Sequence, residues 1–500
     1  MKVWEKIMLY PIGLCYWIAY SAKKTGNFIG RKAKPAIAML VAVTMMLSLM
    51  PITAFAVSSD IIVGGANLGD GSTTVYYKNG DTSGNLTGTA EDYNAKLETV
   101  GGVATLTIKN LSVAKTADAG IKSYVSLKLV LEGASSIAEK DDDEYDCRGI
   151  FVNGDLTISG DGVLSVTAGD AAEDDSYGIY VNGTLTIKSG TINATGGTAS
   201  GSSYGIYATT VMIHDGTVNA TGGTAGSTSG NVSCGIGGFD GVAIYGGTVN
   251  ATGGAAYSSY GIEICYEILG GTVVATGGDA VDDSFGITRG TSDTKFNGGV
   301  VVMRGGTVSD STGSSNAYYS FGIDSIGLDG TKLAGQVVDC TFTGSPESYN
   351  KNATALAIVP SSYTVQNTNL TDGNTTDYTI DTNTAVVTPG TSSNGTPLVL
   401  TEAGSTVTLN GDLVLINLLG EWVTPAFSFS GSSASPAKVT GSGTLTAIGA
   451  AKSDGKSYGI SASGNSYLTV DGVDVIAIGG TASNKSYGIG AAANVTVSNG

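Results

Sequence analysis

The sequence predicts an all-β protein, folded as a parallel β-helix with three short strands in each coil of about 27 residues. Three observations support this prediction. A Gly-Ile pair recurs from Gly149-Ile150 to Gly322-Ile323 at steps of 29, 27, 30, 26, 25 and 36 residues. A segment of the type GTVNATGG follows most of these pairs. Glycine accounts for 75 residues and proline for only 9, which suits short strands joined by tight turns.

One coil can be followed through residues 177–197. Strands are expected at 177–181 (YGIYV), 184–188 (TLTIK) and 191–195 (TINAT), each followed by a turn that contains glycine. Stacked coils would pair each strand in parallel with its copy one coil away, about 4.8 Å apart. A β-propeller is the competing repeat fold, but it needs four strands per blade and about 40 or more residues.

Residues 1–56 are expected to be a signal peptide. A basic segment at 31–34 precedes the 15-residue apolar run Ala36–Met50, and Ala54-Phe55-Ala56 fits a cleavage site. A retained membrane anchor is the alternative, although a spanning helix needs about 20 apolar residues. We therefore predict an exported protein that is secreted or held at the cell surface.

The rest of the chain divides into four regions by its repeats. We expect the first coils at 57–146, the main repeat array at 147–330, a linker or irregular coils at 331–397, and a second β-helix array at 398–500. The motif returns in the second array at Gly459-Ile460 and Gly488-Ile489. Because an uncapped end would expose a strand edge, we expect this array to continue beyond Gly500.

Composition restricts the partners. Charged residues are 14% and apolar residues 41% of the chain, which does not fit a disordered polyampholyte. The net charge is −18, although the leader is basic, so the surface should repel nucleic acid and anionic lipid. We expect no nucleic-acid partner, no membrane insertion after leader cleavage, and a monomer. Four cysteines outside the leader have no metal-ligand or disulfide spacing and are predicted to be buried: Cys147, Cys234, Cys265 and Cys340.

The third strand of each coil has two different faces. Alternation places Ile192 and its equivalents inward and the Thr and Asn residues outward. The stacked outward residues would form hydrogen-bonded ladders that stabilise the helix, and a polar, regular face of this kind would also suit an extended polysaccharide. The candidate carbohydrate-binding residues on this face are Thr191, Asn193, Thr217, Asn219, Thr248 and Asn250.

Aromatic residues stand before the Gly of most motif pairs, for example Tyr177 and Tyr204. Their parity places them inward or at a corner, where they would stack within the solenoid. Tyr180 and Tyr207 have the opposite parity. They are therefore better candidates for contact with a sugar at the surface.

Acidic residues recur just before the Gly-Ile pair. In adjacent coils Asp146 and Asp175 would stack, and carboxylates that close repel each other unless a cation lies between them. Oxygen ligands in loops suit Ca²⁺, and a solvated acidic loop is the alternative. The candidate calcium ligands are Asp146, Asp175, Glu173, Asp174, Glu144 and Asp283.

The sequence offers no convincing catalytic site. The single histidine, His214, is expected to be an exposed strand residue. Arg148 lies next to Asp146, an arrangement more typical of an ion pair than of a lyase base. We therefore expect a binding protein without catalytic activity.

Three blocks of the chain resemble the carbohydrate-binding β-helix domains of secreted and cell-surface proteins of Gram-positive bacteria. They are Val63-Gly64-Gly65 with the strand Thr105–Lys109, then 125–133 leading to 149–160, and the SYGIY and GGTVNATGG units. This resemblance implies a pectate-lyase-like, right-handed helix that binds plant-type or cell-wall polysaccharide, with calcium at acidic loops. The long leader and the presence of acidic loops in only some coils depart from the family.

The function expected from these observations is polysaccharide binding. A structural stalk or adhesin whose repeats provide length is the alternative from a different class. A polysaccharide lyase is the third.

Overall fold

The computed structural model describes most of residues 60–498. The described ranges are 60–116, 119–141, 145–290, 294–310, 314–319, 327–328, 331–336, 355–366, 370, 377–388, 396–400, 403–418, 425–450, 456–462, 466–480, 482, 485–490 and 493–498. The predicted leader, Glu144, Cys340 and Gly322-Ile323 lie outside them. Ser59–Gly500 form one compact unit.

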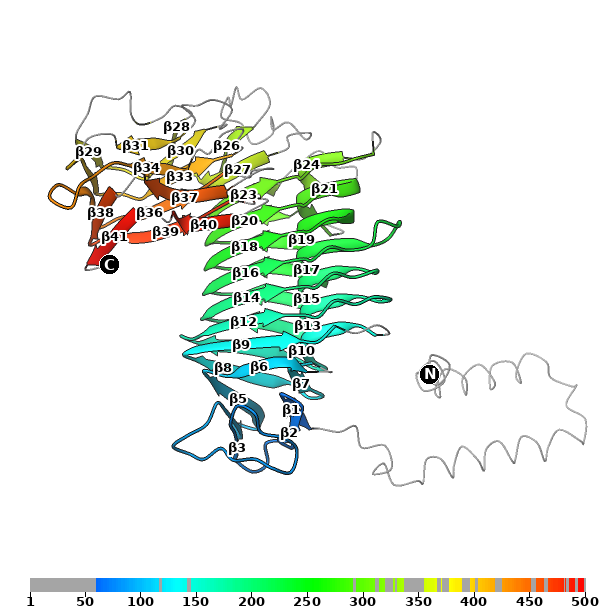
Figure 1. Cartoon of the computed structure of the whole chain (residues 1–500). Coiled ribbons are helices and arrows are strands. Elements are labelled where there is room, and N and C mark those ends of the chain that lie inside the picture. The colour runs from blue at the N-terminus through cyan, green and yellow to red at the C-terminus, as the bar shows by residue number, and fades with distance from the viewer. Residues whose placement is uncertain are drawn as a thin grey trace, which may run out of the picture. The chain divides into compact units, whose positions relative to one another are not determined.

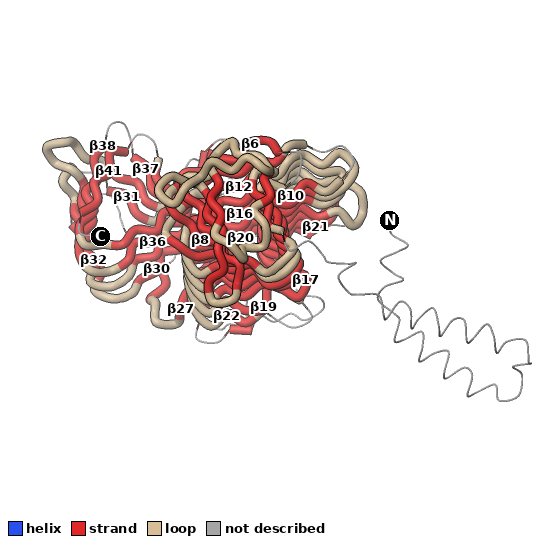
Figure 2. Tube along the Cα trace, turned by 90° about the horizontal axis from the view of Figure 1, so that it is seen from below, coloured by secondary structure: helices blue, strands red, loops and turns tan. Residues whose placement is uncertain are grey.

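The described residues form strands, turns and loops only, as Figure 2 shows. None of these residues belongs to a helix that could cross a membrane. The chain is a parallel β-solenoid of about 10 turns with roughly 29 residues per turn, so the predicted fold class is confirmed. The strands stack as successive rungs in Figure 1.

The first array is built from two sheets, one of 17 strands and one of ten. We call the ten-stranded sheet the ladder sheet. Its strands are β6 (Ser112–Thr116), β9 (Ala134–Glu139), β12 (Val163–Thr167), β14 (Thr191–Thr195), β16 (Thr217–Thr221), β18 (Thr248–Thr252), β20 (Thr272–Thr276), β23 (Val300–Arg304), β27 (Ala355–Pro360) and β26 (Thr331–Gln336).

The 17-stranded sheet holds the remaining strands of the first array. They are β1 (Ile61–Val63), β2 (Ala66–Asn67), β3 (Val75–Tyr77), β4 (Ala95–Val100), β5 (Val103–Lys109), β7 (Ile121–Ser123), β8 (Leu127–Glu132), β10 (Cys147–Val152), β11 (Leu156–Gly160), β13 (Ser176–Ile187), β15 (Ser203–Ile213), β17 (Val232–Ile244), β19 (Ala256–Ile268), β21 (Ala280–Arg289), β22 (Lys295–Phe296), β24 (Ser314–Tyr319) and β25 (Gly327–Leu328).

The first and second predicted strands of a coil are often one strand in the structure. β13 runs through both predicted segments, and its pairing with β15 shifts register between Val181 and Thr184, at the predicted Asn182-Gly183 turn. The neighbouring coil has its corner at the same place. Backbone groups on both sides of the corner therefore remain paired, and the strand continues.

The predicted faces of the third strand are confirmed. Ile192 pairs in register with Val218, which pairs with Val249, and these side chains are completely buried. Asn193 and Asn219 point to the other face and are half-buried. The alternation of the strand thus divides each rung into a core side and an outer side.

The aromatic residues before Gly-Ile stack on one another as predicted, and the ring centroids of Tyr177 and Tyr204 lie 5.5 Å apart with nearly parallel planes. Tyr177 and Tyr204 are buried, but they pack with Cys234 in a cluster separate from the main core. A side chain on Gly178 would meet the backbone of Gly205 and Thr195 within about 3 Å. Only glycine therefore fits at this position of the coil, next to the stacked tyrosines.

The described cysteines fit the sequence prediction. Cys147, Cys234 and Cys265 are buried. Burial raises the pKa of the Cys265 thiol to about 12. These thiols are therefore packing residues in the folded chain.

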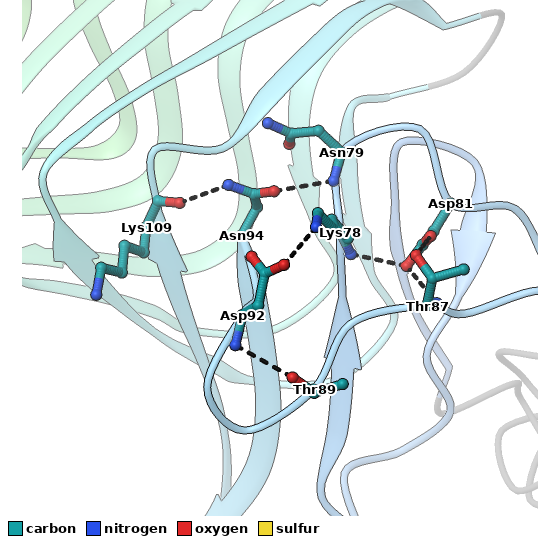
Figure 3. Close-up of polar contacts among 8 residues, drawn as sticks. All are labelled: Lys78, Asn79, Asp81, Thr87, Thr89, Asp92, Asn94 and Lys109. Carbon is teal, nitrogen blue, oxygen red and sulfur yellow. Dashed lines mark hydrogen bonds and ion pairs between the residues drawn. The ribbon is translucent and has the colours of Figure 1, made fainter.

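Antiparallel strands close the N-terminal end of the first array. β3 pairs with β4 and β4 pairs with β5. Side chains hold the loop between β3 and β4 (Figure 3): Asp81 accepts hydrogen bonds from the backbone N–H of Lys78 (2.7 Å) and Thr87 (2.9 Å), and Asn94 accepts one from Asn79 (3.0 Å). This arrangement covers an edge on which another strand would otherwise pair.

The other end of the first array differs from the repeat prediction. The rung after β21 is β24, in which Tyr318 pairs with Ile287, so the predicted step to Gly322-Ile323 is wrong for this rung. In the ladder sheet β23 pairs with β27, which runs antiparallel. The parallel stack of this sheet therefore ends at β23.

The second array contributes one strand per coil to each of three sheets. We call the first of these the docking sheet, which contains β28 (Thr364–Gln366), β30 (Thr384–Thr388), β33 (Leu413–Asn417), β36 (Thr444–Ile448) and β39 (Asp474–Ile478). The second sheet contains β29 (Asp377–Ile380), β32 (Thr406–Leu409), β35 (Ala437–Gly441), β38 (Ser466–Asp471) and β41 (Ala493–Ser498). The third contains β31 (Leu398–Leu400), β34 (Phe427–Phe429), β37 (Lys456–Ala462) and β40 (Lys485–Ile489).

The docking sheet packs against the outer face of the ladder sheet. Val274 and Val302, on the outer face of β20 and β23, belong to one buried cluster with Val387, Ile416 and Ile448 of the docking sheet. Strands buried on both faces carry apolar residues at successive positions. This explains why TVNAT in β18 becomes TVVAT in β20 and VVVMR in β23.

Candidate functional site: a groove along the asparagine and threonine ladder

The outward residues of β14, β16 and β18 form a ladder of polar side chains. Asn219 Nδ2 donates a hydrogen bond to Asn193 Oδ1 (2.9 Å), and Asn193 Nδ2 donates one to Ser165 Oγ (3.2 Å). The next amide along the stack is Asn250, in register with Asn219. Within the described part of the chain the side-chain amide of Asn250 makes no hydrogen bond.

The ladder forms one wall of a groove of about 590 Å³. Five of the six candidate carbohydrate-binding residues of this face line it: Asn193, Thr217, Asn219, Thr248 and Asn250. Thr191 lies at the start of β14 on the same face but is not among the lining residues. The groove therefore crosses three neighbouring strands, a span of about 10 Å at the usual strand spacing.

The opposite wall comes from the second array. It consists of Val475, Ile476, Ala477, Ile478 and Gly479 in and after β39, with Ser486 and Gly488 of β40. Among the described strands of the docking sheet, β39 comes last in order and pairs with β36. The groove thus has a wall of amides and hydroxyls facing a largely aliphatic wall, and none of its lining residues is charged.

The sequence prediction did not include this second wall. The period of the repeat identifies the outer face of each strand but not what lies across it. The only local signal was the replacement of outward Asn by Val at Val274, which indicates that the face becomes covered there. The groove lies at the boundary between the covered and the uncovered part of the ladder.

Tyr180 and Tyr207 lie elsewhere, on the 17-stranded sheet. Their ring centroids are 5.8 Å apart with nearly parallel planes, and Phe151 stacks on Tyr180 at 5.9 Å. The Arg148 guanidinium lies 4.9 Å from the Tyr180 centroid. Neither tyrosine is among the residues that line the groove.

Three of the candidate calcium ligands come together. Carboxylate oxygens of Asp146, Asp174 and Asp175 lie within 4.8 Å of one another, in the loops before β10 and β13. Burial raises the pKa of the Asp146 carboxyl, the ion pair with Arg148 opposes this, and the neighbouring Asp174 raises it further. Tyr177 donates a hydrogen bond to Asp175 Oδ2 (2.8 Å).

The other candidate ligands are not part of this cluster. Glu173 is exposed and is not among the three grouped residues. Asp283 lies in β21, which is separated from β13 by β15, β17 and β19 in the stack. Glu144 lies outside the described residues.

His214 and the arginines have clear structural surroundings. His214 is exposed just after β15, and its ring stacks on Tyr245 with centroids 4.7 Å apart. Arg148 pairs with Asp146, as expected of an ion pair. Arg304 is completely buried, which its isolated position in the sequence did not reveal.

No family model, curated protein or solved structure compared with this chain matches it. The β-solenoid is therefore established by the structure of the chain itself. The resemblance to carbohydrate-binding β-helix domains of Gram-positive bacteria stays a prediction, as does the handedness that this resemblance implies.

Proposed function

We propose that this is an exported, surface-associated protein that binds a polysaccharide in the groove along the asparagine and threonine ladder. The observation that carries the proposal is the groove itself, because it collects five of the six predicted ladder residues opposite an aliphatic wall. We propose a binding protein without catalytic activity. Its partner is an extended glycan.

The two walls match the two kinds of surface on a sugar ring. Asparagine amides offer both donors and acceptors, and threonine hydroxyls do the same, so they can pair with sugar hydroxyls of either polarity. The aliphatic wall formed by Val475 and Ile476 suits the C–H surface of the ring. The regular spacing of the rungs, about 4.8 Å, suits a polymer that repeats its hydroxyl pattern along the groove.

The groove favours a neutral glycan over a polyuronate. No lining residue is charged, and the chain as a whole carries a net charge of −18. An anionic polymer would find no cation in the groove and would be repelled by the surrounding charge. We therefore narrow the predicted plant-type or cell-wall ligand to an uncharged one.

The test is a pull-down with insoluble neutral polysaccharides, followed by titration calorimetry with the soluble oligosaccharide of any polymer that binds. In the groove variant, Asn219→Ala and Asn250→Ala are combined. We expect at least about a tenfold loss of affinity, since each hydrogen bond contributes on the order of 1 kcal/mol.

A matched control exists in a second asparagine pair. Asn182 Nδ2 donates to Asn153 Oδ1 (2.9 Å) between adjacent coils, outside the groove. Combining Asn153→Ala with Asn182→Ala should leave the affinity unchanged. If no neutral glycan binds the unaltered protein, the proposal fails and the stalk or adhesin becomes the better hypothesis.

A further inference from the structure

Arg304, the last residue of β23, has a completely buried side chain. Its guanidinium donates three hydrogen bonds to the second array. Nε donates to the Leu418 carbonyl (2.8 Å), and Nη2 donates to the carbonyls of Asn417 (3.0 Å) and Gly449 (2.9 Å). These carbonyls lie at the ends of β33 and β36, so one side chain of the first array holds two neighbouring strands of the docking sheet.

The surroundings of Arg304 are polar but uncharged. All three acceptors are backbone carbonyls, and within the described residues no carboxylate forms an ion pair with Arg304. Burial lowers the pKa of Arg304 to about 9, so the side chain still carries its charge at neutral pH. A buried charge is tolerated only while its hydrogen-bond partners are present. Burial of Arg304 therefore depends on the second array being in place.

Arg304 also departs from the repeat at a specific position. The equivalent residues in the four preceding rungs are Thr195, Thr221, Thr252 and Thr276. The change from threonine to arginine falls in the rung whose outer residue Val302 is covered by the docking sheet. The apolar residues bury surface at this interface without fixing its orientation. The arginine fixes the orientation, because its N–H donors must meet particular carbonyls.

We infer that Arg304 is the positioning residue that seats the second array on the ladder sheet and thereby builds the second wall of the groove. It fixes β33 and β36, and β36 pairs directly with the wall strand β39. Without this contact the second array can move away from the ladder sheet, so the wall is no longer held at one place along the ladder. This inference rests on the proposed function only where glycan binding is the readout.

The experiment compares Arg304→Met, Arg304→Lys and a control, Arg289→Met. Arg289 is also a buried arginine of the first array, but it ends β21 in the 17-stranded sheet. Small-angle X-ray scattering of the full chain measures whether the arrays stay together, circular dichroism checks the β-structure, and calorimetry measures affinity for the neutral glycan.

We expect Arg304→Met to keep its β-structure, to increase the radius of gyration, and to lose at least about tenfold in glycan affinity. Arg304→Lys should recover part of both losses, because lysine keeps the charge and can still donate to a carbonyl. Arg289→Met should change neither the scattering nor the affinity. If Arg304 served only to stabilise the fold, Arg304→Met would lower the melting temperature, but the scattering and the glycan affinity would not show this loss and partial recovery.

The inference is overturned if Arg304→Met scatters as the unaltered protein does. If Arg304→Met fails to fold, Arg304→Lys decides alone: unchanged scattering and affinity reject the positioning role, and a partial loss of both supports it. If the unaltered protein binds no glycan, the proposed function fails, but the scattering comparison still tests the role of Arg304.

Discussion

One outward residue in the third strand of each coil distinguishes the rungs that line the groove from the rungs that the docking sheet covers. Asn193, Asn219 and Asn250 occupy this position in three successive rungs and are half-buried along the groove. In the next two rungs Val274 and Val302 occupy it and are fully covered. A buried amide needs hydrogen-bond partners whereas a valine does not, so this single position separates the open part of the ladder from the docked part.

Glu263 is a second residue whose environment departs from the repeat. It lies in β19, in register with Gly237, and it affects the titration of Tyr204 and Tyr260. Burial raises the pKa of Glu263 to about 7. The following residue, Ile264, has a positive φ of 55°, which is rare for a β-branched side chain.

We predict that Glu263 makes the protein less stable as the pH rises. Its pKa is higher in the folded chain than the usual value near 4.3, so folding favours the protonated form. The stabilisation is complete below about pH 4 and is lost as the pH approaches 7. Glu263→Gln should therefore increase the free energy of unfolding at pH 8 by up to about 3 kcal/mol, which raises the melting temperature. At pH 4 the melting temperature should stay nearly unchanged.

Thermal melts over this pH range provide the measurement. Glu173→Gln, at an exposed glutamate, is the control and should follow the profile of the unaltered protein. Parallel profiles for Glu263→Gln and the unaltered protein would show that burial of this carboxyl does not affect folding.

At the scale of the element, the corner of each coil is held by a buried serine. Ser203 Oγ donates to the Gly197 carbonyl (2.7 Å) and accepts from the Gly223 N–H (2.8 Å), so it joins the Gly-Gly corners of two successive coils. Ser233 repeats the pattern one coil later. This accounts for the serine of the SYGIY motif, to which the sequence analysis gave no role.

The acidic loops before β10 and β13 join adjacent coils in a different way. We propose that Asp146, Asp174 and Asp175 bind Ca²⁺ between these coils, because three carboxylates within 4.8 Å repel each other when ionised. A bound cation would remove this repulsion in the folded state only. It should therefore raise the melting temperature.

The corresponding prediction is a melting temperature several degrees higher in Ca²⁺ than in EDTA. Asp174→Asn should abolish the difference, whereas Asp283→Asn should keep it, because Asp283 lies away from the cluster. Identical melts of the unaltered protein in the two buffers would reject the calcium site.

At the scale of the whole molecule, neither the net charge nor the groove favours an anionic ligand. The chain carries a net charge of −18, but the groove contains no charged side chain. Binding of a neutral glycan should then be nearly independent of ionic strength, since screening acts on charges. A polyuronate should bind more weakly, and its binding should improve as salt screens the repulsion.

Calorimetry at about 50 mM and about 500 mM NaCl, which span Debye lengths of roughly 14 Å and 4 Å, measures this dependence. The neutral oligosaccharide should give equal affinities at the two concentrations. A marked loss of affinity for that ligand at high salt would mean that charged groups outside the groove contribute to binding.

The sequence by itself determined the solenoid and the two faces of its third strand, and it predicted a period of about 27 residues where the structure has roughly 29. These features are local, because the alternation along a strand and the glycine corners repeat in every coil. The sequence also placed the acidic cluster, since residues one period apart must stack. It left open whether Tyr177 and Tyr204 lie inward or at a corner, and the structure packs them with Cys234 in a cluster separate from the main core.

Only the tertiary structure decided where the ladder is covered and where it stays open. That depends on two surfaces far apart in the sequence, the outer face of β20 and β23 and the docking sheet, which Arg304 connects through Leu418. A repeat pattern carries no information about such a contact, because the period is the same whether a face meets solvent or another sheet. In the described residues the groove lies where β39 faces the ladder beside Asn250.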